Sequence, residues 1–332
     1  MNRWGLFWVL MASSASSIAE AKPIVIAHRG ASAYLPEHTL AAKALAYGLG
    51  ADYIEQDVVL TKDDVPVVLH DIHIDTVTDV ADTFPRRKRK DGRFYAIDFT
   101  LAELKHLRVT ERFHPKTRKS VYPQRFPTWQ SRFQIATLAE EIEMIQGLNH
   151  TMGRDVGLYV EIKNPAWHQT EGKDITKIVH DTLTTYGYPN LHRKIFIQCF
   201  DANALKRLKT EFKSDIPRIQ LLGENTWRYA PTDFDKLKTE TGIKEVAQYA
   251  QGIGPWTNQI FLGLDAKGKP QLSKLVMWAH KHKLLVHPYT LRAEDLPGDM
   301  TMEQAMDVLF KAAKVDGVFT DHPDRVVAFL ND

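Results

Sequence analysis

The chain has 332 residues, of which 43 are Lys or Arg and 41 are Asp or Glu, so its formal net charge is +2. A charge so close to balance, with no basic half, argues against a nucleic-acid partner. Hydrophobic residues make up 44% of the chain, an ordinary fraction for a protein with a sizeable core. The single cysteine, Cys199, excludes an internal disulfide and a cysteine-based metal site.

The first 21 residues have the pattern of a signal peptide. A short apolar run follows Arg3, and Ala19-Glu20-Ala21 fits an A-x-A cleavage site. The run is too short to span a bilayer, and no later segment is apolar for long enough to form a transmembrane helix. We therefore expect an exported protein with no stable membrane anchor, whose mature chain begins at Lys22.

Short β-rich runs alternate with helical patterns along the remaining chain. The strand-like runs are 24–27, 53–58, 66–69, 158–162, 195–199, 218–222, 251–254, 284–287 and 317–320. The helical patterns between them are 39–48, 138–148, 174–186, 202–212, 235–250, 272–281 and 302–314. Such alternation predicts a parallel sheet, and at this length a closed (β/α)8 TIM barrel is a better expectation than an open sheet.

Two segments depart from this regular alternation. There are nine strand-like runs, one more than a (β/α)8 barrel needs. Residues 59–65, between the second and third runs, are too few for a helical crossover, so these two runs could form a hairpin beside the barrel. Residues 72–136 are rich in Arg, Lys, Pro and aromatic side chains, with one helical pattern at 101–107. We interpret them as an insertion after the third strand, packed over one end of the barrel.

Two histidines directly follow apolar strand-like runs. His28 and Arg29 follow the run 24–27, and His70 follows the run that ends at Leu69. Active sites in a (β/α)8 barrel lie at this C-terminal end of the strands. Histidine can accept and donate protons near neutral pH, and arginine can bind a phosphate through two parallel hydrogen bonds. Neither histidine alone distinguishes catalysis from a structural role.

Acidic side chains at two other strand ends favour the catalytic interpretation of these histidines over the structural one. Glu55 and Asp57 are two residues apart on one strand, and Glu161 and Lys163 are two apart on another, so each pair projects to one face. Neighbouring buried carboxylates repel, and a cation between them removes the repulsion. Oxygen ligands alone favour Mg²⁺ or Ca²⁺ over zinc. Together with the histidines, this set predicts metal-assisted phosphoryl transfer.

The motifs in combination resemble those of the glycerophosphodiester phosphodiesterase family, and of its periplasmic members above all. The segments that carry the resemblance are His28-Arg29-Gly30-Ala31-Ser32, Pro36-Glu37-His38-Thr39, Glu55-Gln56-Asp57, Leu69-His70-Asp71, Glu161-Ile162-Lys163 and Phe319-Thr320-Asp321. The resemblance covers nearly the whole mature chain. It implies a (β/α)8 barrel that hydrolyses glycerophosphodiesters, such as glycerophosphocholine or glycerophosphoethanolamine, to an alcohol and sn-glycerol 3-phosphate.

The resemblance also implies roles for individual residues and a location. The metal ligands fall on Glu55, Asp57 and Glu161, with Ca²⁺ as the first choice and Mg²⁺ as the second. The acid–base pair falls on His28 and His70, and the phosphate-contacting groups fall on Arg29 and Lys163. The periplasm is the expected location, with secretion to the medium as second choice.

Further residues are candidates for substrate contacts. Glu37 is expected to orient Arg29 or a loop, and it is also a candidate for contact with the ligand. Four residues that follow strand-like runs are expected to line the glycerol or headgroup pocket: Gln198, Phe200, Trp256 and Tyr289. Family members commonly have asparagine where this chain has His38, which leaves the substrate preference open.

Two other function classes remain open at this point. A phospholipase D-type or sphingomyelinase-like phosphodiesterase would use the same barrel and metal ligands, and an exported binding protein would use the barrel without catalysis. The sequence also leaves open which histidine is the base, and whether a glycerol hydroxyl or water attacks the phosphorus. The expected partner is a small-molecule substrate, and a homodimer is compatible with the sequence.

Overall fold

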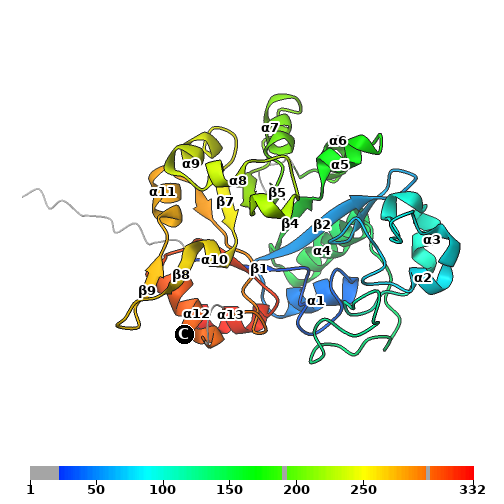
Figure 1. Cartoon of the computed structure of the whole chain (residues 1–332), viewed down its shortest axis with the longest axis horizontal. Coiled ribbons are helices and arrows are strands. Elements are labelled where there is room, and N and C mark those ends of the chain that lie inside the picture. Colours follow the sequence, from blue (N-terminus) through cyan, green and yellow to red (C-terminus); the bar gives the residue numbers. More distant parts are fainter. Residues whose placement is uncertain (1–21, 189–192, 297–299) are drawn as a thin grey trace, which may run out of the picture.

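The computed structural model describes residues 22–188, 193–296 and 300–332. The predicted signal peptide, residues 1–21, lies outside the described residues. Helices surround a central set of strands, and the insertion lies to one side of them (Figure 1). No helix in the described ranges is long and apolar enough to cross a membrane.

Eight parallel strands form the nearly closed barrel. In spatial order they are β10 (Leu285–Val286), β7 (Gly252–Pro255), β6 (Arg218–Leu222), β5 (Ile195–Cys199), β4 (Gly157–Ile162), β2 (Tyr53–Leu60), β1 (Ile24–Ala27) and β11 (Gly317–Thr320). The two end strands meet through hydrogen bonds of 3.0 Å from the Asp316 amide to the Val286 carbonyl and 2.9 Å from the Phe319 amide to the Pro288 carbonyl. The predicted fold class is confirmed.

The helices that follow the strands bury one face against them. The larger ones are α1 (Leu40–Gly48), α4 (Leu138–Met152), α6 (Ile175–Thr185), α7 (Ala202–Thr210), α9 (Glu240–Val246), α11 (Leu275–Lys281) and α13 (Pro323–Asn331). Shorter ones are α5 (Pro165–Thr170), α8 (Phe234–Leu237), α10 (Thr257–Ile260) and α12 (Met302–Met306). Capping chemistry sets their limits: at α4, Thr137 and Glu140 form a reciprocal cap, and Gly153 ends the helix in the left-handed region.

Two helix predictions are wrong in detail. The pattern 235–250 is divided between α8 and α9, because the Thr239 side chain accepts a hydrogen bond from the Gly242 amide and starts a new helix. The pattern 272–281 begins too early, because Leu272 belongs to β9 (Pro270–Leu272), which pairs with β8 (Phe261–Leu264) in a separate two-stranded sheet.

The extra strand-like run explains the count of nine. β3 (Pro66–Val68) turns back and pairs antiparallel with the end of β2, so it is not a barrel strand. The link between them closes with a 3.1 Å hydrogen bond from the Thr61 amide to the Val65 carbonyl and leaves no room for a helix. The insertion does follow the third strand of the chain, but it lies between the second and third strands of the barrel.

The insertion has a hydrophobic core of its own. It contains α2 (Val80–Thr83) and α3 (Leu101–His106), which lie beside the β2–β3 hairpin in Figure 1. Phe99 and Leu104 are fully buried there, together with Val59 and Val67 of the hairpin. The hairpin is therefore the structural link that holds the insertion against the open end of the barrel.

Candidate active site

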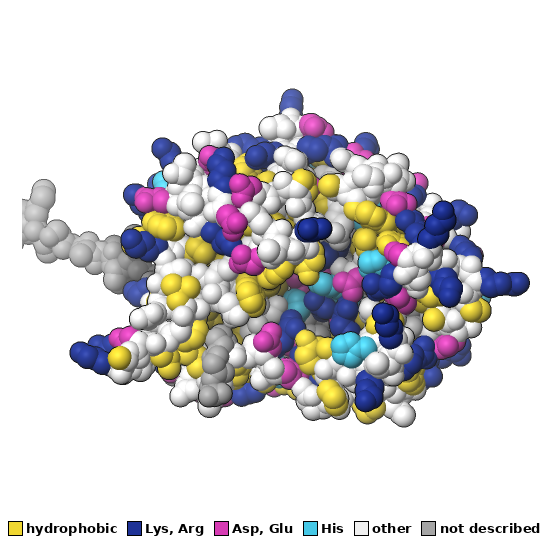
Figure 2. Space-filling model, in the orientation of Figure 1, with side chains coloured by type: hydrophobic (Ala, Val, Ile, Leu, Met, Phe, Trp, Pro, Cys, Tyr) yellow, Lys and Arg dark blue, Asp and Glu magenta, His cyan; other side chains and the backbone are white. Residues whose placement is uncertain are grey.

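A cavity of about 290 Å³ opens at the C-terminal ends of the barrel strands. Figure 2 shows the hollow, with histidine, acidic and basic side chains gathered in it. Every predicted site residue lines this cavity except Glu37, which lines a neighbouring cavity of about 150 Å³ together with His28 and Arg29. The structure therefore brings together residues that are more than 250 positions apart in the sequence.

Three buried carboxylates form the most acidic part of the cavity. Glu55 and Asp57 point from β2 and Glu161 points from β4, where strand register pairs it with Asp57. One oxygen from each lies within 4.8 Å of the others, and the three residues are 3%, 1% and 5% exposed. Asp57 Oδ1 is buried without a hydrogen-bond partner among the described residues, and Lys163 Nζ lies 3.7 Å from it. A hard divalent cation fits this all-oxygen set.

The electrostatics of the triad agree with such a cation. Burial, followed by the charges of Asp57 and Glu161, raises the pKa of Glu55 well above its ordinary value. Burial also raises the pKa of Glu161 to about 8. Three carboxylates at this spacing are unfavourable as anions without a cation, and a bound divalent ion would favour the charged form of all three.

Side chains around the triad hold its remaining oxygens in place. Gln198 Nε2 donates to Glu55 Oε1 at 2.9 Å, and the Arg29 amide donates to Glu55 Oε2 at 2.8 Å. His38 Nε2 lies 2.8 Å from Asp57 Oδ2. Gln198, predicted to line the substrate pocket, therefore contacts a carboxylate of the triad.

His28 enters the cavity directly from the end of β1. Its Nδ1 lies 2.6 Å from Asp321 Oδ1, which follows β11, so its Nε2 is the nitrogen left to face the cavity. Burial, followed by the charge of Arg29, lowers the pKa of His28 to about 4. The imidazole is therefore neutral near pH 7 and can accept a proton.

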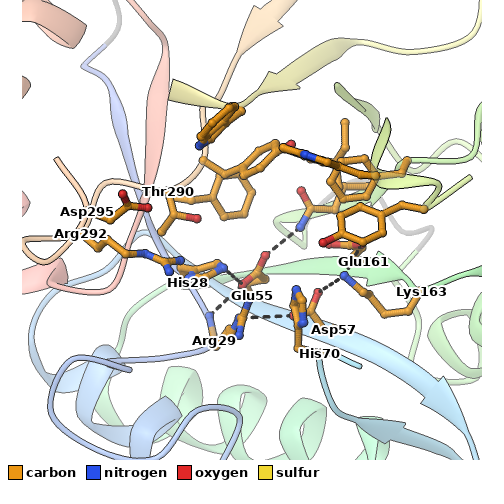
Figure 3. Close-up of a pocket in the computed structure, with 18 residues that line it drawn as sticks. His28, Arg29, Glu55, Asp57, His70, Glu161, Lys163, Thr290, Arg292 and Asp295 are labelled. Atoms are coloured by element: carbon orange, nitrogen blue, oxygen red, sulfur yellow. Dashed lines mark hydrogen bonds and ion pairs between the residues drawn. The ribbon is translucent and has the colours of Figure 1, made fainter. Parts of the chain in front are cut away.

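His70 enters the cavity near Glu55 and Asp57, on the chain that leaves the β2–β3 hairpin (Figure 3). Its Nδ1 lies 2.7 Å from Asp71 Oδ1, and its side chain is 27% exposed, against 8% for His28. Burial, then the charges of Arg29 and Lys163, lowers the pKa of His70 to about 4. Both histidines thus use Nδ1 for a carboxylate and leave Nε2 for chemistry.

Two cations lie beside the triad (Figure 3). Arg29 has φ +58° and donates from Nη1 to Glu37 Oε2 at 3.0 Å. Lys163 Nζ contacts Glu161 Oε1 at 2.7 Å. Gly30 permits the sharp turn after Arg29, because a Cβ there would lie 2.8 Å from the carbonyl carbon of Ala42. Glu37 thus orients Arg29, one of the two roles predicted for it.

Aromatic side chains form the wall of the cavity opposite the histidines. Phe200, Trp256 and Tyr289 lie there as predicted, and the sequence analysis missed Trp227 and Tyr229 on the chain after β6. The ring centroids of Phe200 and Tyr229 are 5.6 Å apart, and those of Trp227 and Trp256 are 5.5 Å apart. This wall offers an apolar surface to the carbon skeleton of a bound alcohol.

Other residues of the site were also missed. Asp71 and Asp321 stand inside motifs that the sequence analysis quoted, so their place directly after His70 and after a strand was a usable signal. Arg292 lines the cavity, and Arg112 and Arg125 line the neighbouring one. These three arginines lie in irregular segments, where no periodicity marks them.

Comparison with known proteins decides the family. Residues 28–325 match the model of the glycerophosphoryl diester phosphodiesterase family. The chain belongs to this family. Like the rest of the family, it is a metal-dependent enzyme, and it carries the acidic triad that could hold the metal.

Relatives of high similarity carry the same description. A glycerophosphodiester phosphodiesterase of Haemophilus influenzae is 43% identical over 328 residues, which span 92% of this chain and 89% of that protein. Another, from Treponema pallidum, is 39% identical over 347 residues and spans 98% of this chain and 95% of its own.

Solved structures of the family share the fold. A putative glycerophosphoryl diester phosphodiesterase from Silicibacter pomeroyi has a TM-score of 0.70 at 22% identity and covers 94% of this chain and 95% of its own. An Oleispira antarctica phosphodiesterase in complex with the product sn-glycerol-3-phosphate has a TM-score of 0.62 at 21% identity, with 94% and 98% covered.

Proposed function

We propose that the protein hydrolyses glycerophosphodiesters to an alcohol and sn-glycerol 3-phosphate by acid–base catalysis between His28 and His70, with Ca²⁺ on Glu55, Asp57 and Glu161. The observation that carries the proposal is that both histidines, each with a carboxylate at Nδ1 and Nε2 left over, line the same cavity as the acidic triad. The name of the Oleispira antarctica structure, which includes the product sn-glycerol-3-phosphate, supports the same product here.

Ca²⁺ is the metal we propose, with Mg²⁺ as the second choice: carboxylate oxygens suit either hard cation, and the resemblance to periplasmic members of the family favours Ca²⁺. When bound, such a cation would polarise a phosphate oxygen and stabilise the charge that develops there. Arg29 and Lys163 are positioned to bind the remaining phosphate oxygens, since both cations point into the cavity beside the triad. A phosphodiester bound by these groups would lie in the cavity that both imidazoles line.

The protonation of the two histidines follows from their surroundings. One neutral imidazole accepts a proton from the nucleophile, which is either water or the neighbouring glycerol hydroxyl, and the other, protonated, imidazole donates a proton to the leaving alkoxide. In the free protein both are neutral at pH 7, because the pKa of each is about 4. The anionic phosphate beside them raises the pKa of an imidazole, so the acid can be charged by substrate binding.

The experiment compares small diesters with intact lipids. Purified protein is incubated with glycerophosphocholine, phosphatidylcholine or sphingomyelin, with Ca²⁺ or with a chelator, and glycerol 3-phosphate release is coupled to its dehydrogenase. We expect release from glycerophosphocholine alone, abolished by the chelator. Free choline from the intact lipids would instead indicate the phospholipase-type alternative, and no release from any substrate would leave a binding protein.

We also propose that the protein is exported to the periplasm, with residues 1–21 removed. The A-x-A pattern that ends at Ala21 supports cleavage after that residue. The sequence has no cysteine near this site to which a lipid anchor could be attached. Mass spectrometry of the protein in a periplasmic extract should find Lys22 as the first residue. A chain that keeps its leader, or one found only in the cytoplasmic fraction, would contradict this.

A further inference from the structure

Each catalytic histidine is backed by a carboxylate, and each of these carboxylates is bound by an arginine of the insertion. His70 contacts Asp71, which is bound by Arg112. His28 contacts Asp321, which is bound by Arg125. The two arginines are 13 positions apart in the irregular part of the insertion, and both line the cavity of about 150 Å³ that adjoins the histidines.

Arg112 uses its whole guanidinium in this arrangement. Nη1 donates to Asp71 Oδ2 at 2.7 Å. Nε and Nη2 donate to the two oxygens of Glu37 at 2.9 and 2.6 Å, and Glu37 also holds Arg29. One insertion side chain therefore fixes both the carboxylate behind His70 and the carboxylate that orients a phosphate-binding arginine.

Arg125 is more deeply buried, with 9% of its surface exposed. Its Nη2 donates to Asp321 Oδ2 at 2.7 Å, and Nε and Nη2 contact the two oxygens of Glu294 at 2.7 and 3.0 Å. The Tyr122 ring lies 3.9 Å from the guanidinium carbon, and the Tyr122 hydroxyl accepts a 2.7 Å hydrogen bond from Arg292. The guanidinium is thus held on several sides.

We propose that Arg112 and Arg125 are positioning residues, through which the insertion fixes the orientation and tautomer of both catalytic histidines. This inference rests on the acid–base roles proposed above. A carboxylate that accepts from Nδ1–H keeps the imidazole with a free Nε2, and it can do so only while its own rotamer is fixed. Each arginine supplies that restraint through the second carboxylate oxygen.

The position of each imidazole affects the rate of proton transfer. Proton transfer requires the reacting atoms within hydrogen-bond reach, and a misplacement of about 1 Å can lower the rate by ~10²-fold. A carboxylate released from its arginine can rotate and leave Nδ1 without its acceptor. The loss should therefore fall on kcat, whereas KM depends on the triad, Arg29 and Lys163.

The test replaces each arginine and uses two leaving groups. For Arg112→Met and Arg125→Met we expect kcat on glycerophosphocholine to fall by about 10–100-fold, with partial recovery in Arg112→Lys and Arg125→Lys. KM should change less for Arg125→Met, because Arg112 also braces Arg29 through Glu37. A glycerophosphodiester of p-nitrophenol needs no acid for its leaving group, so the arginine behind the acid histidine should then matter much less.

Arg89 provides the matched control. It is also an insertion arginine bound to two carboxylates, Asp98 at 2.7 and 2.8 Å and Glu171 at 2.9 and 2.8 Å, but neither carboxylate contacts a catalytic histidine. Arg89→Met should lose stability in thermal unfolding and keep its kcat. If either arginine variant does not fold, Asp71→Asn and Asp321→Asn ask the same question with nearly unchanged shape.

The outcomes separate this inference from the proposed function. Inactive His28→Ala and His70→Ala together with arginine variants that match Arg89→Met would overturn the positioning role and leave the function standing. Active histidine variants would overturn the function itself. Equal losses with both leaving groups in both arginine variants would also overturn the inference, because neither loss would then pass through the acid histidine.

Discussion

His28 and His70 reach one cavity from two parts of the molecule that are built differently. His28 ends a barrel strand that is hydrogen-bonded on both sides, and its side chain is 8% exposed. His70 follows a three-residue hairpin strand, and its side chain is 27% exposed. Both have a carboxylate on Nδ1, and both carboxylates are bound by the insertion. A barrel strand and a short hairpin strand can therefore present histidines with matching carboxylate contacts, provided that charged side chains of the insertion hold the carboxylates in place.

The comparison is tested first by removing each histidine. His28→Ala and His70→Ala should each lower kcat by about 10²–10⁴-fold, because general acid–base catalysis contributes that much. Steady-state kinetics on glycerophosphocholine measure the effect. His280→Ala is the control, since His280 also contacts an aspartate, Asp316 at 2.9 Å, but lies outside the cavity. Near-normal turnover in both cavity variants would refute the assignment.

The acidic triad belongs to the barrel alone, and its loss should be almost as severe. Asp57→Asn should lower kcat by about 10³-fold, because cation stabilisation of the transition state contributes several kcal/mol. Asp181→Asn, which replaces an exposed carboxylate of α6, should have no effect. Activity in Asp57→Asn that is high and insensitive to chelator would show that the triad does not hold the metal.

A fully buried ion pair joins α1 and α4 next to the triad. Among the described residues, the insertion has no ion pair with both side chains fully buried. Lys43 Nζ lies 3.1 Å from Glu141 Oε2 and also contacts the Glu55 carbonyl oxygen, and both side chains are 0% exposed. Lys43→Met should destabilise the protein by about 3–5 kcal/mol, because it leaves a buried carboxylate unpaired. The double variant Lys43→Met/Glu141→Leu should recover part of the lost stability in thermal unfolding. If it recovers none, the loss in Lys43→Met does not come from the unpaired Glu141 carboxylate.

The insertion carries a different kind of buried charge. Glu111 is 2% exposed, its Oε2 has no hydrogen-bond partner, and burial followed by the charge of Glu37 raises its pKa to about 8. The folded state therefore binds a proton that the unfolded state releases near pH 4.5, so this group makes stability fall as pH rises from about 5 to 8.

Glu111→Gln should remove that pH dependence. Its melting temperature should match the wild type near pH 5 and exceed it at pH 8.5, by an amount equivalent to a free energy of a few kcal/mol or less. Thermal unfolding at the two pH values measures the difference. Equal melting temperatures at both would show that Glu111 titrates normally.

The same two regions differ in how far the sequence predicts them. The barrel was predictable because its signals are local: apolar runs lead directly into His28 and Glu161, and the Glu55–Asp57 pair stands inside a short β-rich run. The antiparallel pairing of β3 with β2 could be expected only because the link between the two strands is too short for a helix. Trp227 and Tyr229 stand several residues beyond the end of β6, so no strand end marks them as cavity residues.

The arginines of the insertion were beyond prediction for a physical reason. Arg112 and Arg125 lie among many other basic residues of 72–136, most of which face solvent, and no helical or strand period separates them. Their partners, such as Glu294 and Asp321, lie up to 196 positions away. Only the tertiary arrangement shows which arginines are bound behind a histidine.

The most direct test of the account measures metal binding and turnover in the same three proteins. Isothermal titration with Ca²⁺ and glycerophosphocholine hydrolysis are compared in the wild type, in Asp57→Asn and in the double variant His28→Ala/His70→Ala. The histidine variant should bind Ca²⁺ as the wild type does and show no turnover, whereas Asp57→Asn should lose both properties. Turnover by the double histidine variant, or unchanged Ca²⁺ affinity in Asp57→Asn, would refute the proposed roles of these residues.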